Sequence, residues 1–320
     1  MSRIGVIGAG AVGSAALLSL VVRGSAREIV VLNRGRKRAR AVATDLRYGA
    51  ALSAVVDVHD GDYADLSGVS LVMIAAGVNE KTGGATDRKD EAGRLRLLDS
   101  NVAIYRDILP QLYRVARDAV ILVLTDPPDP LADLVRSFGF AHVLSSGTFL
   151  DSLRFRDHLA RRLEVAPSSV SADVLGEHGT SEVFVWSSAR VSGIPVLAAL
   201  QQRNRGRSVG SEAEVRASIE QEVRYANITI IEGNQASQFG IGMVAARIAE
   251  MVLRDERAVI PIGSYNPLYG VTLSVPGVVG RNGVVQILEP DLSDDERRRL
   301  QRSAETLRNA VARTVARKEA

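Results

Sequence analysis

The 320-residue chain contains no cysteine, which excludes disulfides and metal sites built on thiolates. Its four histidines are scattered without the spacing of a helical metal site, so we expect no metal. No apolar run is long enough to cross a membrane, and no basic, apolar, small-residue leader stands at the N-terminus. We therefore expect a cytoplasmic protein that does not bind a membrane.

The chain also lacks a dominant charge. It has 40 basic and 37 acidic residues, and they are dispersed along predicted helices rather than gathered with the few aromatic residues. This pattern argues against nucleic acid as a partner. With 46% hydrophobic residues, the chain can build two packed lobes.

The N-terminus has the order strand, glycine-rich turn, helix, strand. An apolar strand at 3–7 leads into the sequence Gly-Ala-Gly-Ala-Val-Gly at 8–13, a helix through Val22, and a second strand at 28–32. Glycines at this spacing allow a tight turn and a close approach to a pyrophosphate, which the helix N-terminus attracts. We expect a dinucleotide-binding site that includes Gly8, Gly10, Ala11, Val12 and Gly13.

The second strand ends without the acid that normally accepts hydrogen bonds from the ribose of NAD. Asn33 and Arg34 stand there instead, followed by Arg36, Lys37, Arg38 and Arg40. A neutral pocket beside cations favours a 2′-phosphate, so Asn33, Arg34 and Lys37 predict NADPH rather than NADH. Arg38 and Arg40 are expected to lie on the solvated face of the next helix.

Further apolar strands are predicted at 71–76 and 119–124, continuous as buried parallel strands are. The predicted fold is α/β, with a Rossmann doubly wound parallel sheet at 1–146 and an α+β substrate or catalytic domain at 147–320. We expect shorter strands in the second domain. Its last helix should be long and charged, beginning at a capping box formed by Ser293 and Glu296.

Three residues suit reduction of a 2-oxo acid. Hydride delivery leaves an alkoxide that needs a proton, and His178 can supply it because histidine titrates near neutrality. Asp151 could fix the tautomer of that ring and stabilise its protonated form. The guanidinium of Arg154 matches a substrate carboxylate. Taken singly, Asp151 and Arg154 also fit a helix N-cap and a solvated side chain.

The whole chain resembles the lactate and malate dehydrogenase family. The resemblance rests on Gly-Ala-Gly-Ala-Val-Gly at 8–13, Gly61-Asp62-Tyr63, Ala75-Ala76-Gly77, Arg94 with Asn101, Leu150-Asp151-Ser152, Gly176-Glu177-His178-Gly179 and Val275-Pro276-Gly277. It implies that His178 and Asp151 form the proton-transfer pair and that Arg154 binds the substrate carboxylate. It also implies that Arg94, on a mobile loop, closes over the substrate and polarises its carbonyl. A homodimer or homotetramer is typical of the family.

The resemblance extends to residues around the cofactor and the substrate. Ser237 stands where the family usually has a threonine near the substrate, and Ile241 where an apolar residue backs the nicotinamide. Ala76, Gly77 and Thr125 are expected on the cofactor side.

Two substitutions depart from the family pattern near the substrate. Asp126 replaces an asparagine before Pro127, and an ionised carboxylate accepts hydrogen bonds but repels a substrate carboxylate. Asp126 is therefore protonated, turned towards a donor, or facing a substrate with its own positive group. By resemblance, the bond between Asp126 and Pro127 can be cis. Thr180 replaces a usual acid, from which we expect a small local effect.

The stretch from Val78 to Gly93 is about eight residues longer than in the family and enlarges the substrate loop. Counted forward, Glu80 takes the specificity position, which favours a cationic or amine-bearing substrate. Counted back from Arg94, Arg88 takes it, which favours a second anionic group. We prefer Arg88, because a residue that moves with Arg94 should keep its register with Arg94.

The sequence thus predicts an NADPH-dependent reductase of a 2-oxo acid. One alternative is a reductase of a modified substrate, such as a phosphonate analogue or an amino-bearing 2-oxo acid. The other is a catalytically silent NADPH-binding protein.

Overall fold

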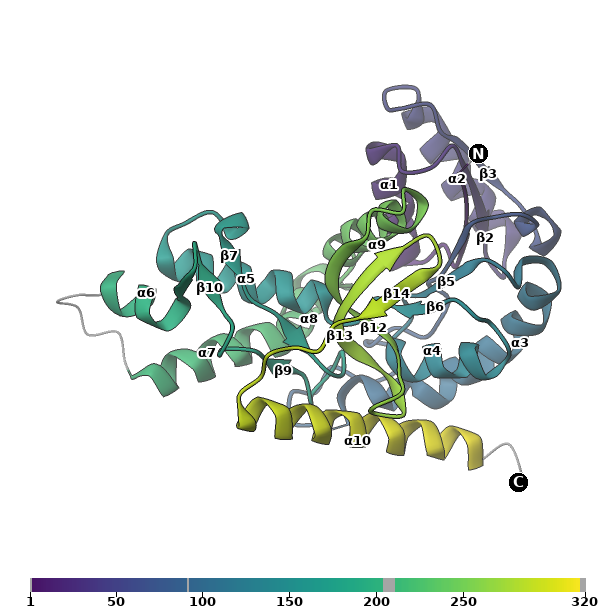
Figure 1. Ribbon diagram of the computed structural model, residues 1–320. Coiled ribbons are helices and arrows are strands. Elements are labelled where there is room, and N and C mark those ends of the chain that lie inside the picture. The colour runs from purple at the N-terminus through teal and green to yellow at the C-terminus, as the bar shows by residue number, and fades with distance from the viewer. Residues whose placement is uncertain (1, 91, 204–210, 317–320) are drawn as a thin grey trace.

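The computed structural model describes residues 2–90, 92–203 and 211–316, and its central element is a nine-stranded sheet (Figure 1). The strand order is β14-β13-β12-β6-β5-β4-β1-β2-β3. The parallel strands are β1 (Arg3–Ile7), β2 (Glu28–Leu32), β3 (Asp57–Asp60), β4 (Leu71–Ile74), β5 (Val120–Val123) and β6 (Val143–Ser145). Their order, 3-2-1-4-5-6 in sequence numbering, is that of a doubly wound dinucleotide-binding fold, which confirms the predicted fold class.

Helices connect these strands. They are α1 (Ala11–Arg23), α2 (Arg36–Ala50), α3 (Leu98–Ala116) and α4 (Pro128–Ser137), with the 3₁₀ helices η1 (Tyr63–Leu66) and η2 (Gly93–Leu97). In open α/β sheets, ligands bind at the carboxyl ends of the parallel strands, where the order of strands reverses. Here that edge lies at the ends of β1 and β4, which are neighbours in the sheet.

An antiparallel extension continues the same sheet beyond β6. Its strands are β12 (Ala258–Asn266), β13 (Val271–Gly280) and β14 (Gly283–Ile287), and Gly263 of β12 pairs with Ser145 of β6. The expectation of shorter strands in the second half is wrong for β12 and β13, which have nine and ten residues. The two halves therefore share one sheet, and a domain boundary at 146 stays a prediction.

The remaining elements surround this extension. The helices are α5 (Phe149–Leu163), α6 (Val196–Arg203), α7 (Glu212–Arg224), α8 (Ala226–Asn234), α9 (Phe239–Leu253), α10 (Asp294–Ala316) and the 3₁₀ helix η3 (Pro167–Ser169). The short strands are β7 (Val170–Ser171), β8 (Val174–Leu175), β9 (Val183–Phe184), β10 (Arg190–Val191) and β11 (Ile194–Pro195). The predicted capping box before α10 is present, since the backbone N–H of Ser293 donates to the Glu296 carboxylate at 2.9 Å and Glu296 N–H donates to Ser293 Oγ at 3.4 Å.

Helix α9 packs against α1 in the core, as Figure 1 shows. A Cβ atom added to Gly242 of α9 would lie 2.6 Å from the backbone of Ala15 in α1, so this close approach requires glycine. Among the described residues, no single helix is long and apolar enough to span a membrane. Helices α8 and α9 pass that test only as a pair bent by 118°.

Candidate active site

The site centres on a buried pair formed by His178 and Asp151. Asp151 lies in the first turn of α5, and His178 follows β8 after Gly176, whose positive φ of 85° turns the chain. His178 Nδ1 lies 2.5 Å from Asp151 Oδ2, and Asp151 is only 2% exposed. Burial opposes ionisation of Asp151, but His178, Arg154 and Arg94 outweigh it and hold the pKa of that carboxyl well below its usual range. The pair is thus an ionised carboxylate that orients an imidazole.

Arg154 attaches a guanidinium to this pair. It lies one turn further along α5, where its Nη1 donates to Asp151 Oδ1 at 2.9 Å. Its Nη2 lies 3.5 Å from the hydroxyl of Ser237, just before α9. Residues separated by more than eighty positions therefore meet at one point, and a role for them in binding a carboxylate stays a prediction.

Arg94 and Asp126 lie on the other side of the imidazole. Arg94, in η2, is 8% exposed, and its Nε lies 3.4 Å from Asp126 Oδ2. Asp126 Oδ1 lies 3.8 Å from His178 Nε2, so the carboxyl faces the ring nitrogen that Asp151 leaves free. The Asp126–Pro127 bond is cis, as the resemblance implied. Asp126 is therefore turned towards cationic and hydrogen-bonding groups rather than to water alone.

The position beside Arg94 and Asp126 belongs to Glu80. Burial raises the pKa of Glu80, and the neighbouring Asp126 carboxyl raises it further, while Arg94 opposes the shift. The Asn101 side chain links the start of this loop to Asp126. Its Oδ1 accepts from Val78 N–H at 2.7 Å, and its Nδ2 donates to the Asp126 carbonyl at 2.6 Å. These bonds hold Val78, two positions before Glu80, beside the backbone of Asp126.

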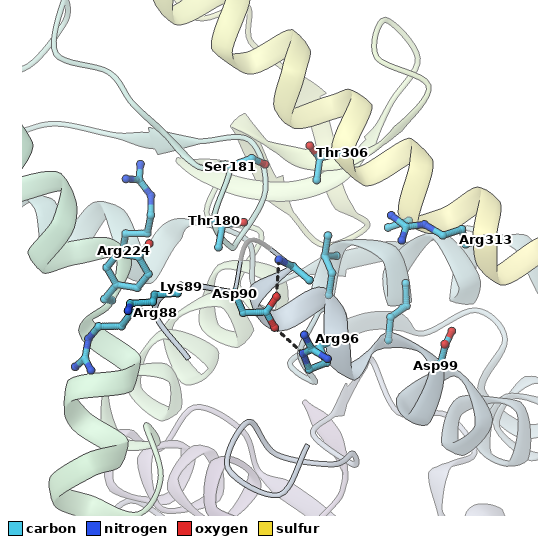
Figure 2. A pocket seen from close by; sticks show the side chains of 15 residues that line it. Arg88, Lys89, Asp90, Arg96, Asp99, Thr180, Ser181, Arg224, Thr306 and Arg313 are labelled. Atoms are coloured by element: carbon cyan, nitrogen blue, oxygen red, sulfur yellow. Dashed lines mark hydrogen bonds and ion pairs between the residues drawn. The ribbon is translucent and has the colours of Figure 1, made fainter. Parts of the chain in front are cut away.

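The structure does not bring Arg88 to this cluster, and the role preferred for it as the selector stays a prediction. Its guanidinium makes two hydrogen bonds to Glu232 on α8, at 2.6 and 3.0 Å, and a third to Thr229 at 3.2 Å. In Figure 2 its side chain extends away from Asp90 and Arg96. The physical reason is that this part of the loop lies on the surface, where the exposed Glu232 carboxylate pairs with Arg88.

A cavity of about 770 Å³ lies between the loop that carries η2 and helix α10 (Figure 2). Cationic side chains line it, among them Lys89, Arg96 and Arg224. Neither His178 nor Asp151 lines this cavity. It therefore lies beside the cluster formed by His178 and Asp151 and does not contain that cluster.

Glu182 is a buried carboxyl that the sequence did not single out. It is 6% exposed, and its Oε1 lies 3.7 Å from Arg224 Nε. Burial raises the pKa of Glu182 well above its usual range, and the neighbouring Asp151 adds to the effect. The only indication in the sequence was its position, because Glu182 stands two residues after Thr180, and an acid is usual at position 180.

The glycine-rich turn fits a dinucleotide. Gly8 has a φ of 107°, and a Cβ atom on Gly13 would lie 1.8 Å from the carbonyl oxygen of Gly8, so both positions require glycine. A Cβ on Gly10 would meet nothing within 4 Å, which leaves open space above the turn. Helix α1 begins there without a side-chain cap, so its first N–H groups can bind a phosphate.

The other predicted cofactor residues line the same edge of the sheet. Thr125 Oγ1 donates to the carbonyl of Ala76 at 2.9 Å, and a Cβ on Gly77 would lie 2.3 Å from the Thr125 methyl group. Ile241, on α9, packs with Val12 against the core below. These contacts place the ends of β4 and β5 beside the glycine turn.

Asn33 ends β2 and ties into the glycine turn. Its Oδ1 accepts a hydrogen bond from Ala9 N–H at 3.1 Å, and Arg38 Nε donates to the Ala9 carbonyl at 2.6 Å. Arg36 and Arg40 pair instead with Asp60, at 3.0 and 3.6 Å. Arg34 and Lys37 are exposed. The cationic groups thus divide into those that bind Asp60 and those beside the turn.

Asp129 supports His178 from below and gives a pH-dependent prediction. Its Oδ2 accepts the His178 backbone N–H at 3.0 Å, its Oδ1 accepts the Ser145 hydroxyl at 2.5 Å, and burial raises its pKa to about 7. Between about pH 4 and about pH 7 the folded chain keeps on Asp129 a proton that the unfolded chain has released. The free energy of unfolding therefore falls as pH rises through this range. Asp129→Asn should flatten the pH dependence of the free energy of unfolding between about pH 5 and about pH 7.5 in urea titrations. An unchanged slope would show that Asp129 does not titrate there.

Comparison with known proteins agrees with this geometry. Residues 2–142 match the family model described as lactate/malate dehydrogenase, NAD binding domain, and residues 148–318 match the alpha/beta C-terminal domain of the same family. The chain is 43% identical over 307 residues to an L-lactate dehydrogenase of Deinococcus radiodurans, covering 96% of this chain and 97% of that one. It is 40% identical over 317 residues to an L-lactate dehydrogenase of Thermus aquaticus, covering 97% and 98%.

A solved structure gives the same likeness in three dimensions. The minor L-lactate dehydrogenase of Enterococcus mundtii superposes with a TM-score of 0.87 at 29% identity, over 97% of this chain and 98% of that chain.

Proposed function

This chain belongs to the lactate/malate dehydrogenase family, and from that premise we propose that it reduces a 2-oxo acid to the 2-hydroxy acid with NADPH. The observation that carries the proposal is the contact of 2.5 Å between His178 and the buried Asp151, with Arg154 bonded to the same carboxylate. A proton donor, the group that orients it and a carboxylate anchor are thereby held as one unit.

Arg154 would bind the substrate carboxylate. One of its terminal nitrogens is committed to Asp151 and the other lies beside Ser237, which fixes the plane of the guanidinium. A planar guanidinium held in this way offers paired N–H groups to a carboxylate and so orients the ketone.

His178 would protonate the ketone oxygen from Nε2, because Nδ1 is engaged by Asp151. When bound, the reduced nicotinamide supplies the hydride, so the carbonyl carbon gains a hydride, the oxygen gains a proton, and a 2-hydroxy acid results. Asp151 stabilises the imidazolium before the proton leaves. Arg94, buried beside Asp126, would stabilise negative charge on the same oxygen.

The cofactor preference rests on the end of β2. Asn33 is neutral where a carboxylate would repel a 2′-phosphate, and the exposed side chains of Arg34 and Lys37 stand next to it. Arg38, held near the turn by the Ala9 carbonyl, adds a third cation. These groups support NADPH, although the family model is described by its NAD binding.

The proposal is tested by following NADPH oxidation with 2-oxo acids whose far ends are neutral, anionic or cationic. Turnover of at least one, lost when the ketone is absent, supports reduction. Tight NADPH binding without turnover of any 2-oxo acid would favour a silent cofactor-binding protein. The family resemblance also predicts a homodimer or homotetramer, which sedimentation would distinguish.

Asn33→Asp should reverse the cofactor preference. Asp retains the oxygen that accepts the Ala9 N–H, so the turn should persist, while its charge repels a 2′-phosphate and can accept ribose hydroxyls. We expect kcat/KM with NADPH to fall at least about tenfold and that with NADH to rise.

Arg40→Gln is the matched control for this variant, because Arg40 is exposed and pairs with Asp60. It should leave the ratio of the two cofactors nearly unchanged. A wild-type protein with higher kcat/KM for NADH would overturn the NADPH proposal.

A further inference from the structure

Two carboxyl groups, Glu80 and Asp126, lie near each other beside Arg94, and Asp126 also lies beside His178; we call them the acid pair. Asp126 Oδ1 lies 3.8 Å from His178 Nε2. Glu80 lies two positions after Val78, which Asn101 ties to the Asp126 backbone, and its pKa is raised by the neighbouring Asp126 carboxyl. Asp126 follows β5 and Glu80 begins the inserted loop, so two separate segments bring them together. Asp126 thus places the pair close to the position that a ketone would occupy to receive a proton from His178 Nε2.

The cations of the cluster do not balance its carboxyl groups. Asp151 is served by Arg154, and Glu182 by Arg224. Arg94 lies in the field of Asp126, Asp151, Glu80 and Glu182 together, and among the described residues it is the guanidinium that serves both members of the acid pair. The acid pair therefore has two carboxyl groups beside a single guanidinium, and a further cation would be stabilised there.

Burial disfavours the charged form of the Glu80 carboxyl. Desolvation is the main reason that the pKa of Glu80 is raised, and the neighbouring Asp126 carboxyl raises it further. Two carboxyls that share a site hold a cation between them readily, whether a proton or an ammonium group. An ammonium has three N–H donors and can bond to both carboxyls at once.

We propose that the acid pair binds an ammonium group carried by the substrate, so that the preferred substrate is a 2-oxo acid with an amine on the third or fourth carbon. This inference rests on the proposed reduction of a 2-oxo acid. The amine must be close to the ketone, because Asp126 lies between the imidazole and Arg94.

The same geometry disfavours the other substrate classes. A substrate with a second carboxylate would bring a negative charge against two carboxyl groups, and Arg88, which could have received it, is engaged by Glu232. A neutral alkyl end would leave the acid pair desolvated and without a new partner.

A pair of isosteric substrates isolates this interaction. In 4-amino-2-oxobutanoate an ammonium stands where 2-oxopentanoate has a methyl group, so the two differ in charge and hardly in size. We expect wild-type kcat/KM to favour the amine by about tenfold to a hundredfold, the range for a hydrogen bond to a charged group. Equal values or a preference for 2-oxopentanoate would overturn the proposal.

Glu80→Gln should abolish the preference for the amine while 2-oxopentanoate is still reduced, and Asp126→Asn should do the same if the first variant folds poorly. Glu305→Gln makes the same change of charge at an exposed position of α10 and should leave the substrate ratio unaltered. Retention of the amine preference in both site variants would contradict a role for the acid pair.

Binding separates this proposal from the proposed reaction. The products 4-amino-2-hydroxybutanoate and 2-hydroxypentanoate can be titrated calorimetrically into the wild-type protein loaded with oxidised cofactor. Tighter binding of the amine supports the acid pair even where no 2-oxo acid is turned over, an outcome that would reject only the reductase activity. Equal binding of the two products would reject the acid pair as an ammonium site.

Discussion

His178→Asn is expected to lose about 100- to 10,000-fold in turnover of its 2-oxo acid while binding NADPH almost as well as the wild type. Asparagine can keep a hydrogen bond to Asp151, which lies 2.5 Å from the imidazole, but it has no proton of suitable acidity for the ketone oxygen. The hydrogen bonds described for His178 are with Asp151 and Asp129, and none joins it to the glycine turn, so cofactor affinity should persist. Stopped-flow single turnovers and fluorescence titration with NADPH measure the two effects separately.

The matched control is His158→Asn. His158 lies on α5, the helix that carries Asp151, but its Nδ1 pairs with Glu222 at 2.7 Å, away from the cluster. This variant should retain wild-type turnover. If His178→Asn were as active as His158→Asn, His178 would not be the proton donor.

Much of the fold could be predicted because its strongest determinants are local. The glycine turn, the apolar strands β4 and β5 and the capping box before α10 each depend on residues adjacent in sequence. The junction of β6 with β12 could not be predicted in this way, since it joins Ser145 to Gly263. Close packing there requires glycine, because a Cβ on Gly263 would lie 1.8 Å from the Ser145 hydroxyl oxygen.

The site shows the same division. Asp151 and Arg154 are one helical turn apart, and their meeting follows from the geometry of α5. The register of the inserted loop has no such local rule. It depends on the side chain of Asn101, which bonds to Val78 and so places Glu80, and on Glu232, which draws Arg88 to the surface. Glu182 escaped notice because its partner Arg224 lies 42 residues away on α7.

Asp151→Asn is the second variant with a large expected effect, because one carboxylate serves two partners. Its Oδ2 faces His178 Nδ1 at 2.5 Å and its Oδ1 accepts from Arg154 at 2.9 Å. An amide can present one oxygen only, and if that oxygen stays with Arg154, its NH₂ group faces the imidazole. The ring must then accept at Nδ1, and its protonated form loses the charge that stabilised it. We expect kcat to fall by about 100- to 10,000-fold, as for the loss of the proton donor itself.

Asp157→Asn controls for the loss of an ion pair on the same helix. Asp157 pairs with Arg161 at 2.7 Å on the exposed side of α5, so its replacement should cost little stability and no activity. Asp151→Asn should also lower the melting temperature, because it leaves the partly buried Arg154 without its carboxylate. Retained NADPH binding would show that the site is still folded. If turnover then equalled that of Asp157→Asn, Asp151 would be a structural partner of Arg154 and would have no part in orienting the imidazole.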